Sequence, residues 1–288
     1  MKTKNLKIKK MLKKQIRFVC NNEMNSLKPG NVHKYSAGHG MNVKDFIKSG
    51  EIISNYLTNN KYNLGKKILN SVIETKKKIR KNTNLGIILM LSPIITVVEK
   101  EGILTKKKLL KKIKSLLIKQ NTKNSYDIFK VISIATPGGL GFSKKYDVNK
   151  LPRISLYKAM EYSKKKDLIA KQYCSGFKDI LEVGIPAYDK FYKKWGKVNW
   201  ALTGVYLTFL KKFNDSHIIR KNGIKIAINV KKQAKKYYNI LKNYENMKII
   251  EKKLLFFDKM LKNNEINPGT TADLTVATLL LELVTKKQ

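Results

Sequence analysis

Apolar residues recur every three to four positions along almost the whole chain, whereas the alternating pattern of β-strands is nearly absent. In residues 104–119, Leu109, Ile113 and Leu116 stand against a run of lysines, which is typical of an amphipathic helix. Comparable patterns fill residues 1–25, 42–57, 64–72, 85–98, 124–135, 153–183, 187–213, 223–244, 248–263 and 271–285. The sequence therefore predicts an all-α fold.

The helical patterns follow one another without an obvious domain boundary. No Pro-rich or Ser-rich linker divides the 288 residues, and no repeat of fixed period is present. A hydrophobic content of 42% can supply a sizeable core. We therefore expect residues 1–288 to form a single compact multi-helix domain, in which the basic residues 1–14 fray.

The net charge of +41, from 61 basic and 20 acidic residues, puts a strong positive field over the surface. Nearly all of the surplus is Lys, and it is spread along the chain together with many Asn, Ile and Tyr residues, which share A/T-rich codons. Lys without interleaved Arg is a weak signal for nucleic-acid recognition. We predict that nucleic acid is not the main partner, although anionic small molecules would profit from the same field.

Cysteine usage and hydropathy indicate a cytoplasmic protein. Cys20 and Cys174 lie far apart and show no metal-ligand spacing, as expected in reduced cytosol. Lysines interrupt the first residues, so no signal peptide is expected, and the apolar residues 85–98 are too few for a membrane span. A buried core helix is the better interpretation of that segment.

Residues 267–273, with the sequence NPGTTAD, open the last helical pattern. Thr270 is predicted as the N-cap, with Asp273 reaching back to it in a capping box. The first turn of such a helix has unpaired N–H groups and can bind an anion. The alternative is a capped terminal helix without further function.

A second break, residues 136–141 with the sequence TPGGLG, can form a nest of N–H groups that holds phosphate. It matches neither the P-loop nor the dinucleotide fingerprint, and a tight turn is the alternative. A third break precedes His33, whose near-neutral pKa suits proton transfer, unless the side chain is simply packed.

Residues 215–221, with the sequence DSHIIRK, combine a carboxylate, an imidazole and two cations. On a helix Ser216, His217, Arg220 and Lys221 share a broad face, with Asp215 near the N-cap. No Cys and His metal site and no nucleophile elbow are present. Asp147, Asp167 and Asp273 could supply oxygen ligands for Mg²⁺ on a triphosphate.

Taken together, six stretches resemble the triphosphoribosyl-dephospho-CoA synthase family, which makes the precursor of the prosthetic group of citrate lyase and malonate decarboxylase. In chain order they are residues 28–33 (KPGNVH), 82–86 (NTNLG), 137–141 (PGGLG) followed by 147–148 (DV), 167–173 (DLIAKQY), 215–221 (DSHIIRK) and 267–273 (NPGTTAD). Asn222 stands where the family pattern has His, and Thr136 replaces a more usual Asn or Ala.

The resemblance implies an all-helical pentosyltransferase in which Gly-rich breaks line one nucleotide site. The triphosphoribosyl group of ATP would pass to the 2′-hydroxyl of dephospho-CoA, with release of adenine. Implied catalytic residues are His33, Asp273 and Asp167, and Mg²⁺ is expected with ATP, at Asp147. Implied substrate-binding and phosphate-binding residues are Lys28, Gly30, Asn31, Asn84, Gly138, Gly139, Gly141, Gln172, Asp215, Arg220, Lys221, Asn267, Gly269, Thr270 and Thr271.

Two alternatives remain at this stage. Members of the family also occur in organisms with no obvious citrate lyase, so the chain could transfer a related pentosyl group to another coenzyme precursor. A basic helical protein that binds nucleic acid is the second alternative, and it predicts steeply salt-dependent binding. The acceptor and the oligomeric state are not legible in the sequence.

Overall fold

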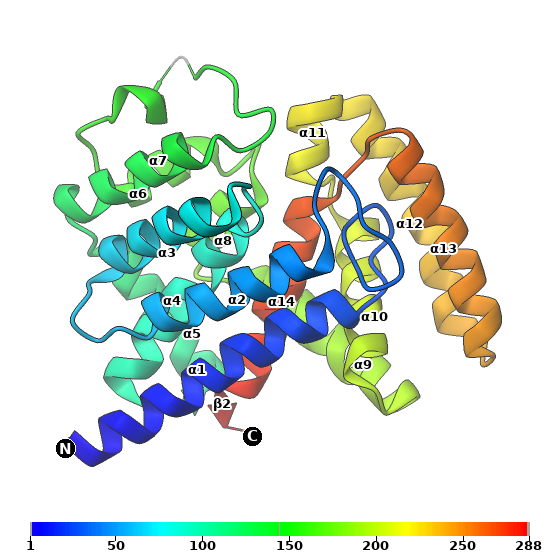
Figure 1. Ribbon diagram of the computed structural model, residues 1–288, viewed down its shortest axis with the longest axis horizontal. Helices are drawn as coiled ribbons and strands as arrows, with labels where there is room; N and C mark the ends of the chain where they lie inside the picture. Colours follow the sequence, from blue (N-terminus) through cyan, green and yellow to red (C-terminus); the bar gives the residue numbers. More distant parts are fainter. Residues whose placement is uncertain (1, 144, 287–288) are drawn as a thin grey trace.

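The last long helix, α14 (Gly269–Leu283), lies at the centre of the molecule (Figure 1). Its residues are mostly apolar or Thr, and 11 of its 15 residues are buried. Buried Thr side chains are tolerated because the hydroxyls of Thr275 and Thr278 donate to the carbonyls of Thr271 and Leu274, at 2.8 and 2.9 Å. Helices from both the N-terminal and the C-terminal half of the chain pack against it.

The computed structural model describes residues 2–143 and 145–286. Around α14 the described helices are α1 (Lys2–Asn25), α2 (Val43–Leu57), α3 (Leu64–Ile79), α4 (Leu85–Glu101), α5 (Lys106–Ile118), α6 (Thr122–Ala135), α7 (Leu156–Ser163), α8 (Leu168–Ser175), α9 (Ile185–Trp195), α10 (Val198–Lys212), α11 (Ser216–Asn222), α12 (Ile224–Asn243) and α13 (Met247–Asn263). A 3₁₀ turn, η1 (Val148–Lys150), and a π-helical segment, η2 (Ile180–Gly184), complete the helical elements. The strands β1 (Leu104–Thr105) and β2 (Thr285–Lys286) form a short parallel pair.

The all-α prediction is confirmed, with differences in detail. Residues 2–14, where fraying is expected, are part of α1. The predicted helix over residues 187–213 is two helices, because Gly196 takes a left-handed conformation (φ 62°) and ends α9. Residues 153–183 are likewise divided among α7, α8 and η2.

Helix α4 is the apolar segment that the sequence predicts as a buried core helix, and the structure confirms this. It packs against α14, α3 and α5, and 12 of its 17 residues are buried. Among the described residues, no helix combines the length and the apolar character needed to cross a membrane.

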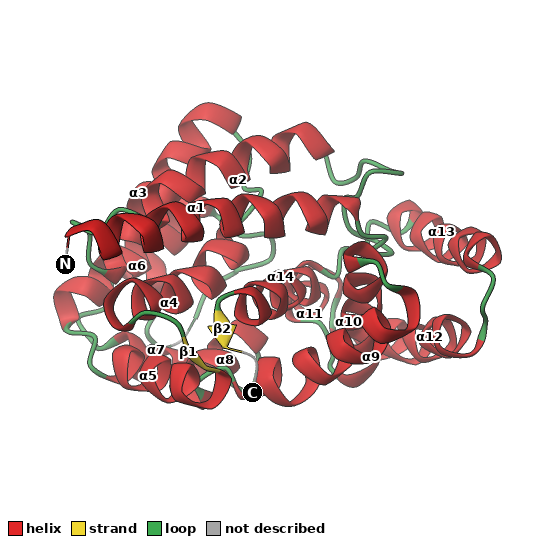
Figure 2. Ribbon diagram, turned by 90° about the horizontal axis from the view of Figure 1, so that it is seen from below, coloured by secondary structure: helices red, strands yellow, loops and turns green. Residues whose placement is uncertain are grey.

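One connected hydrophobic cluster extends from Leu12 to Val284. It supports the prediction of one domain. Figure 2 shows α1 crossing over α14, with α3 and α6 at one side and the α12–α13 pair at the other. The breaks before α4, after α6 and before α14 meet near the N-terminal end of α14, and residues of α11 lie beside them.

Candidate active site

These breaks surround a cavity of about 1020 Å³. Its lining comes from the loop after α1, the start of α4, the loop after α6, the α7–α8 turn, α11 and the start of α14. This volume is at the upper end of the range of about 300–1,000 Å³ for small-molecule pockets. The cavity is therefore large enough for a nucleotide together with a second substrate.

The start of α14 differs from the predicted capping box. The helix begins at Gly269, with Pro268 before it and no side-chain cap, so the prediction of Thr270 as the N-cap is wrong. The acceptor comes from another helix instead, because Asp215 Oδ2 accepts from the Thr271 amide and hydroxyl at 2.7 and 2.8 Å. Within the described residues the Thr270 amide has no acceptor, and Thr270 lines the cavity. One N–H group of this helix end remains free for a ligand.

Asp215 joins α11 to α14 from behind the cavity wall. It is the N-cap of α11, as the sequence predicts, and its Oδ1 accepts from the amides of His217 and Ile218 at 2.8 and 3.0 Å. Burial raises its pKa, against the effect of these hydrogen bonds. Asp215 does not line the cavity, and its four contacts fix the helix that carries His217 and Arg220.

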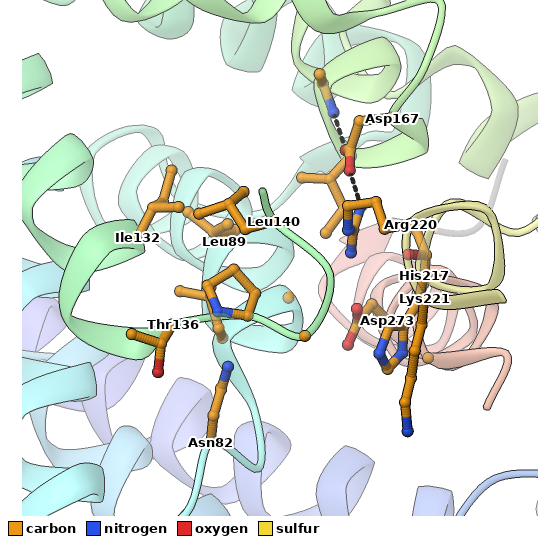
Figure 3. Close-up of a pocket in the computed structure, with 18 of the residues that line it drawn as sticks. Asn82, Leu89, Ile132, Thr136, Leu140, Asp167, His217, Arg220, Lys221 and Asp273 are labelled. Carbon is orange, nitrogen blue, oxygen red and sulfur yellow. Dashed lines mark hydrogen bonds and ion pairs between the residues drawn. The ribbon is translucent and has the colours of Figure 1, made fainter. Parts of the chain in front are cut away.

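Arg220 and Lys221 bring positive charge to the cavity from α11. Arg220 Nη1 lies 2.5 Å from Asp167 Oδ2, while Asp167 Oδ1 accepts from the Ala170 amide as the cap of α8. Figure 3 shows the Asp167–Arg220 pair on the same side of the cavity as His217, Lys221 and Asp273. The Nε of Arg220 is buried without a partner among the described residues. The guanidinium thus keeps a donor available.

Asp273 reaches the cavity one turn into α14. No hydrogen bond or ion pair holds its carboxylate among the residues that the structure describes. Burial, followed by the charges of Asp215 and Asp167, raises its pKa well above the ordinary value, although Arg220 acts in the opposite direction. Gly86 lies against this carboxylate, and a methyl carbon built there would overlap it. The start of α4 therefore leaves room for Asp273.

His217 is a cavity residue that the sequence prediction places beside Arg220 but does not include among the site residues. A Cβ added to Gly269 would lie 2.6 Å from His217 Nδ1, and one added to Gly138 would lie 3.3 Å from Nε2. Burial, then the charge of Arg220, lowers its pKa to about 4. The imidazole is therefore neutral at pH 7. Its position in the middle of the DSHIIRK stretch is the signal that could have found it.

The loop after α6 lies close to α11. Gly139 has φ 71°, and a Cβ there would lie 2.6 Å from the carbonyl carbon of Arg220. Only glycine fits this approach. Thr136, a β-branched residue, also has positive φ, 42°, which is a strained conformation at the edge of the cavity. Gly138 and Gly141 line the cavity, whereas Gly139 does not.

Asp147 closes this loop and lines the cavity. Its Oδ2 accepts from the Ser143 amide and its Oδ1 from the Asn149 amide, at 2.9 and 2.8 Å, and these hydrogen bonds lower its pKa. Within the described part of the chain, no three His, Cys, Asp or Glu side chains gather as a metal site. A metal ion here would take most of its ligands from substrate and water.

Several predicted site residues lie behind the cavity rather than in it. Lys28 is fully buried, paired with Glu23 and 3.1 Å from Asn31 Oδ1, and burial lowers its pKa. Asn31 in turn donates to Asn267 Oδ1 at 2.8 Å. Glu23, Asn31 and Asn267 do line the cavity. The Lys28 ammonium does not line the cavity, but its positive charge acts on the Asp273 carboxylate there.

His33, Gly30 and Gln172 are likewise outside the cavity lining. His33 is buried with Nε2 3.2 Å from Asp258 Oδ1, which also accepts from the Gly30 amide at 2.8 Å. Burial lowers the pKa of His33. Gln172 donates to Asp179 Oδ2 at 2.6 Å. These contacts hold the loop after α1 and the end of α8 in place.

The opposite side of the cavity is apolar, which sequence reasoning missed. Leu89, Ile132 and Leu140 face the charged residues in Figure 3, and Phe129 lines the same side. In the sequence Leu89, Phe129 and Ile132 have the helical spacing of ordinary core positions, so nothing distinguishes them from packing residues.

In this helical protein the cavity combines cations, a free amide at a helix end and a carboxylate without a partner among the described residues, opposite an apolar wall. These are the features of a nucleotide-dependent transferase. The chain belongs to a family described as ATP:dephospho-CoA triphosphoribosyl transferase, whose model matches residues 12–288. The family predicted from the six stretches is confirmed, and so is the pentosyltransferase activity that it implies.

A solved structure has the same fold. It comes from Archaeoglobus fulgidus and is described, provisionally, as a triphosphoribosyl-dephospho-CoA synthase. The two chains are 22% identical and superpose with a TM-score of 0.64, over 83% of this chain and 98% of the other. No curated protein sequence matches significantly.

Proposed function

We propose that the cavity at the start of α14 is where this transferase brings ATP and dephospho-CoA together. The observation that carries the proposal is the Asp273 carboxylate, which is unpaired among the described residues and lies beside the cations of α11. In the reaction, the bond between C1 of the ATP ribose and adenine breaks, with its electron pair going to adenine. The 2′-hydroxyl oxygen of dephospho-CoA then bonds to C1.

The triphosphate is assigned to the side of the cavity formed by α11 and the start of α14. Arg220 and Lys221 supply charge, and the free Thr270 amide supplies a donor at a helix N-terminus. Gly138 and Gly141 bring further backbone N–H groups from the loop after α6. The net charge of +41 attracts such anionic substrates over a longer range.

Asp273 is assigned the proton transfer and the stabilisation of the positively charged ribose. Of the two candidate bases, Asp273 faces the cavity, while His33 is buried beside Asp258. A carboxylate with a raised pKa can accept the hydroxyl proton of the acceptor, as in glycoside chemistry. The proton then passes through solvent to the released adenine, which balances the reaction. Asp167 serves by orienting Arg220.

Mg²⁺ is proposed to enter with ATP, since it usually binds through phosphates, water and one or two carboxylates. Asp147 fits as the protein ligand, because a carboxylate oxygen that accepts one amide keeps a second lone pair and Asp147 faces the cavity. The bound ion would supply neutralisation of the triphosphate. Cytoplasm is the proposed compartment, in agreement with the two free cysteines, Cys20 and Cys174.

The experiment is to incubate the protein with ATP, Mg²⁺ and dephospho-CoA and to analyse the products by mass spectrometry. A dephospho-CoA product that has gained a triphosphoribosyl group is expected. Adenine release without that product would keep the donor assignment and refute dephospho-CoA as the acceptor. A folded protein that yields neither product would refute the proposal.

A further inference from the structure

Asn84 occupies the N-cap position of α4 but does not cap the helix. Its φ and ψ are −149° and 22°, and no backbone amide of α4 donates to its side chain. The side chain is 5% exposed, lines the cavity, and its Nδ2 is buried without a partner among the described residues. Asn at this position normally accepts from the first turn, and buried amide groups are normally hydrogen-bonded. The Asn84 side chain departs from both expectations, since it neither caps α4 nor has a partner for its Nδ2 among the described residues.

Four apolar residues line the same cavity as Asn84. Leu89 lies on the next turns of α4, Phe129 and Ile132 come from α6, and Leu140 comes from the loop after α6. Figure 3 shows Leu89, Ile132 and Leu140 together on the side opposite Arg220 and Asp273. Asn84 and these four residues form what we call the adenine slot. A flat ring with polar edges suits such a surface, because its faces contact aliphatic side chains while its edge meets an amide.

We propose that the adenine slot binds the purine ring of ATP, with the free amide of Asn84 donating to a ring nitrogen of the base. The inference rests on the proposed function, since it assigns one part of ATP within the same cavity. The triphosphate then lies on the charged side and the base on the apolar side, with the ribose between them.

The position of Asp273 supports ATP as the source of this adenine. Asp273 lies against Gly86, two residues after Asn84, so the carboxylate and the amide both lie near the N-terminal end of α4. In ATP the base is bonded to the reacting C1 atom itself, so a base held at Asn84 keeps C1 close to Asp273. Dephospho-CoA also carries adenine near its reacting hydroxyl, so the experiment measures binding of both substrates.

To test this, calorimetry measures the dissociation constants of Mg-ATP and of dephospho-CoA for the wild type and for Asn84→Ala. ATP is expected to bind about three- to tenfold more weakly to the variant, the usual effect of one lost neutral hydrogen bond. Binding of dephospho-CoA is expected to be unchanged. Since Asn84 makes no side-chain hydrogen bond in the described protein, the variant should fold.

Asn63→Ala is the matched control. Asn63 is the N-cap of α3 and accepts from the Lys66 amide at 2.9 Å, outside the cavity lining. This variant is expected to lower the melting temperature without changing the binding of ATP. For Asn84→Ala the opposite pattern is expected, with weaker ATP binding and an unchanged melting temperature.

Binding of 1-deaza-ATP, 3-deaza-ATP and 7-deaza-ATP locates the contact on the base, because each analogue lacks one of the three accepting ring nitrogens. The analogue that lacks the accepting nitrogen should bind the wild type as weakly as ATP binds Asn84→Ala, and the variant should not distinguish that analogue from ATP. Unchanged ATP binding by Asn84→Ala, or weaker binding of dephospho-CoA alone, would refute the proposal that the adenine slot binds the base of ATP. Release of adenine by the wild type tests the proposed function separately from either result.

Discussion

Replacing Gly86 by Ala should reduce the activity of the protein without reducing its stability. Gly86 belongs to the first turn of α4, has no positive φ, and lies against the Asp273 carboxylate. Ala is the better helix former by about 1 kcal/mol, so propensity alone predicts a protein at least as stable as the wild type. The substitution is harmful only if the space beside Gly86 is needed by Asp273.

The size of the effect follows from the geometry. A Cβ at residue 86 would lie 2.8 Å from the farther oxygen of Asp273, whereas ordinary contacts begin at 3.4 Å, and it would overlap the nearer oxygen. The carboxylate must therefore move, by about 1 Å or more at the nearer oxygen. Misplacement of a catalytic group by 1 Å can reduce the rate about 100-fold. We expect a loss of that order in kcat, with normal thermal unfolding.

The assay is adenine release by chromatography for Gly86→Ala, Asp273→Ala and the double variant. If Gly86 acts by making room for Asp273, the double variant should be no slower than Asp273→Ala, because both changes affect one group. Full activity of Gly86→Ala would refute the role of this space. Losses that simply multiply in the double variant would show that Gly86 acts by another route.

Three further predictions concern α11. Arg220→Lys should raise the KM for ATP about three- to tenfold, measured by steady-state kinetics, because an ammonium does not reproduce the planar donor set that reaches Asp167; an unchanged KM would contradict the phosphate assignment. Asp215→Asn should reduce the free energy of unfolding in urea by about 1–3 kcal/mol, because an amide replaces the buried acceptor of the Thr271 amide and hydroxyl; unchanged stability would contradict its joining role. The pKa of His217 is lowered to about 4 from an ordinary value of about 6.5, so protonation of this side chain favours the unfolded state. The free energy of unfolding of the wild type should therefore fall as the pH decreases from 6.5 towards 4. His217→Gln should remove part of that fall, measured by urea unfolding at pH 7 and 4.5. Parallel pH curves for the two proteins would argue against a buried neutral imidazole.

The helices were predictable from sequence because their apolar spacing is regular and dense. Helix boundaries were less predictable where the backbone conformation of a single residue decides them. Gly196, for example, ends α9 inside a continuous helical pattern. The same applies to α14, where the sequence suggests a cap at Thr270 but the acceptor comes from Asp215, more than 50 residues earlier in the chain.

The sequence predicted which stretches form the site, but not which of their residues line the cavity. Lys28 and His33 stand in recognisable motifs, yet both are buried and support the residues that line the cavity. Sequence patterns do not distinguish a side chain that touches a substrate from one that holds its neighbour. Leu89 and Ile132 illustrate the converse, since core-like residues line the apolar side.

Asp273, in the cavity at the start of α14, is the residue to which we assign the transfer. The most direct measurement is a single-turnover assay of adenine release from ATP, with and without dephospho-CoA, for the wild type and Asp273→Asn. The wild type is expected to release adenine at a rate that depends on dephospho-CoA. Asp273→Asn is expected to fold normally and to bind ATP, but to lose most of that rate. Equal rates for the two folded proteins would contradict this assignment.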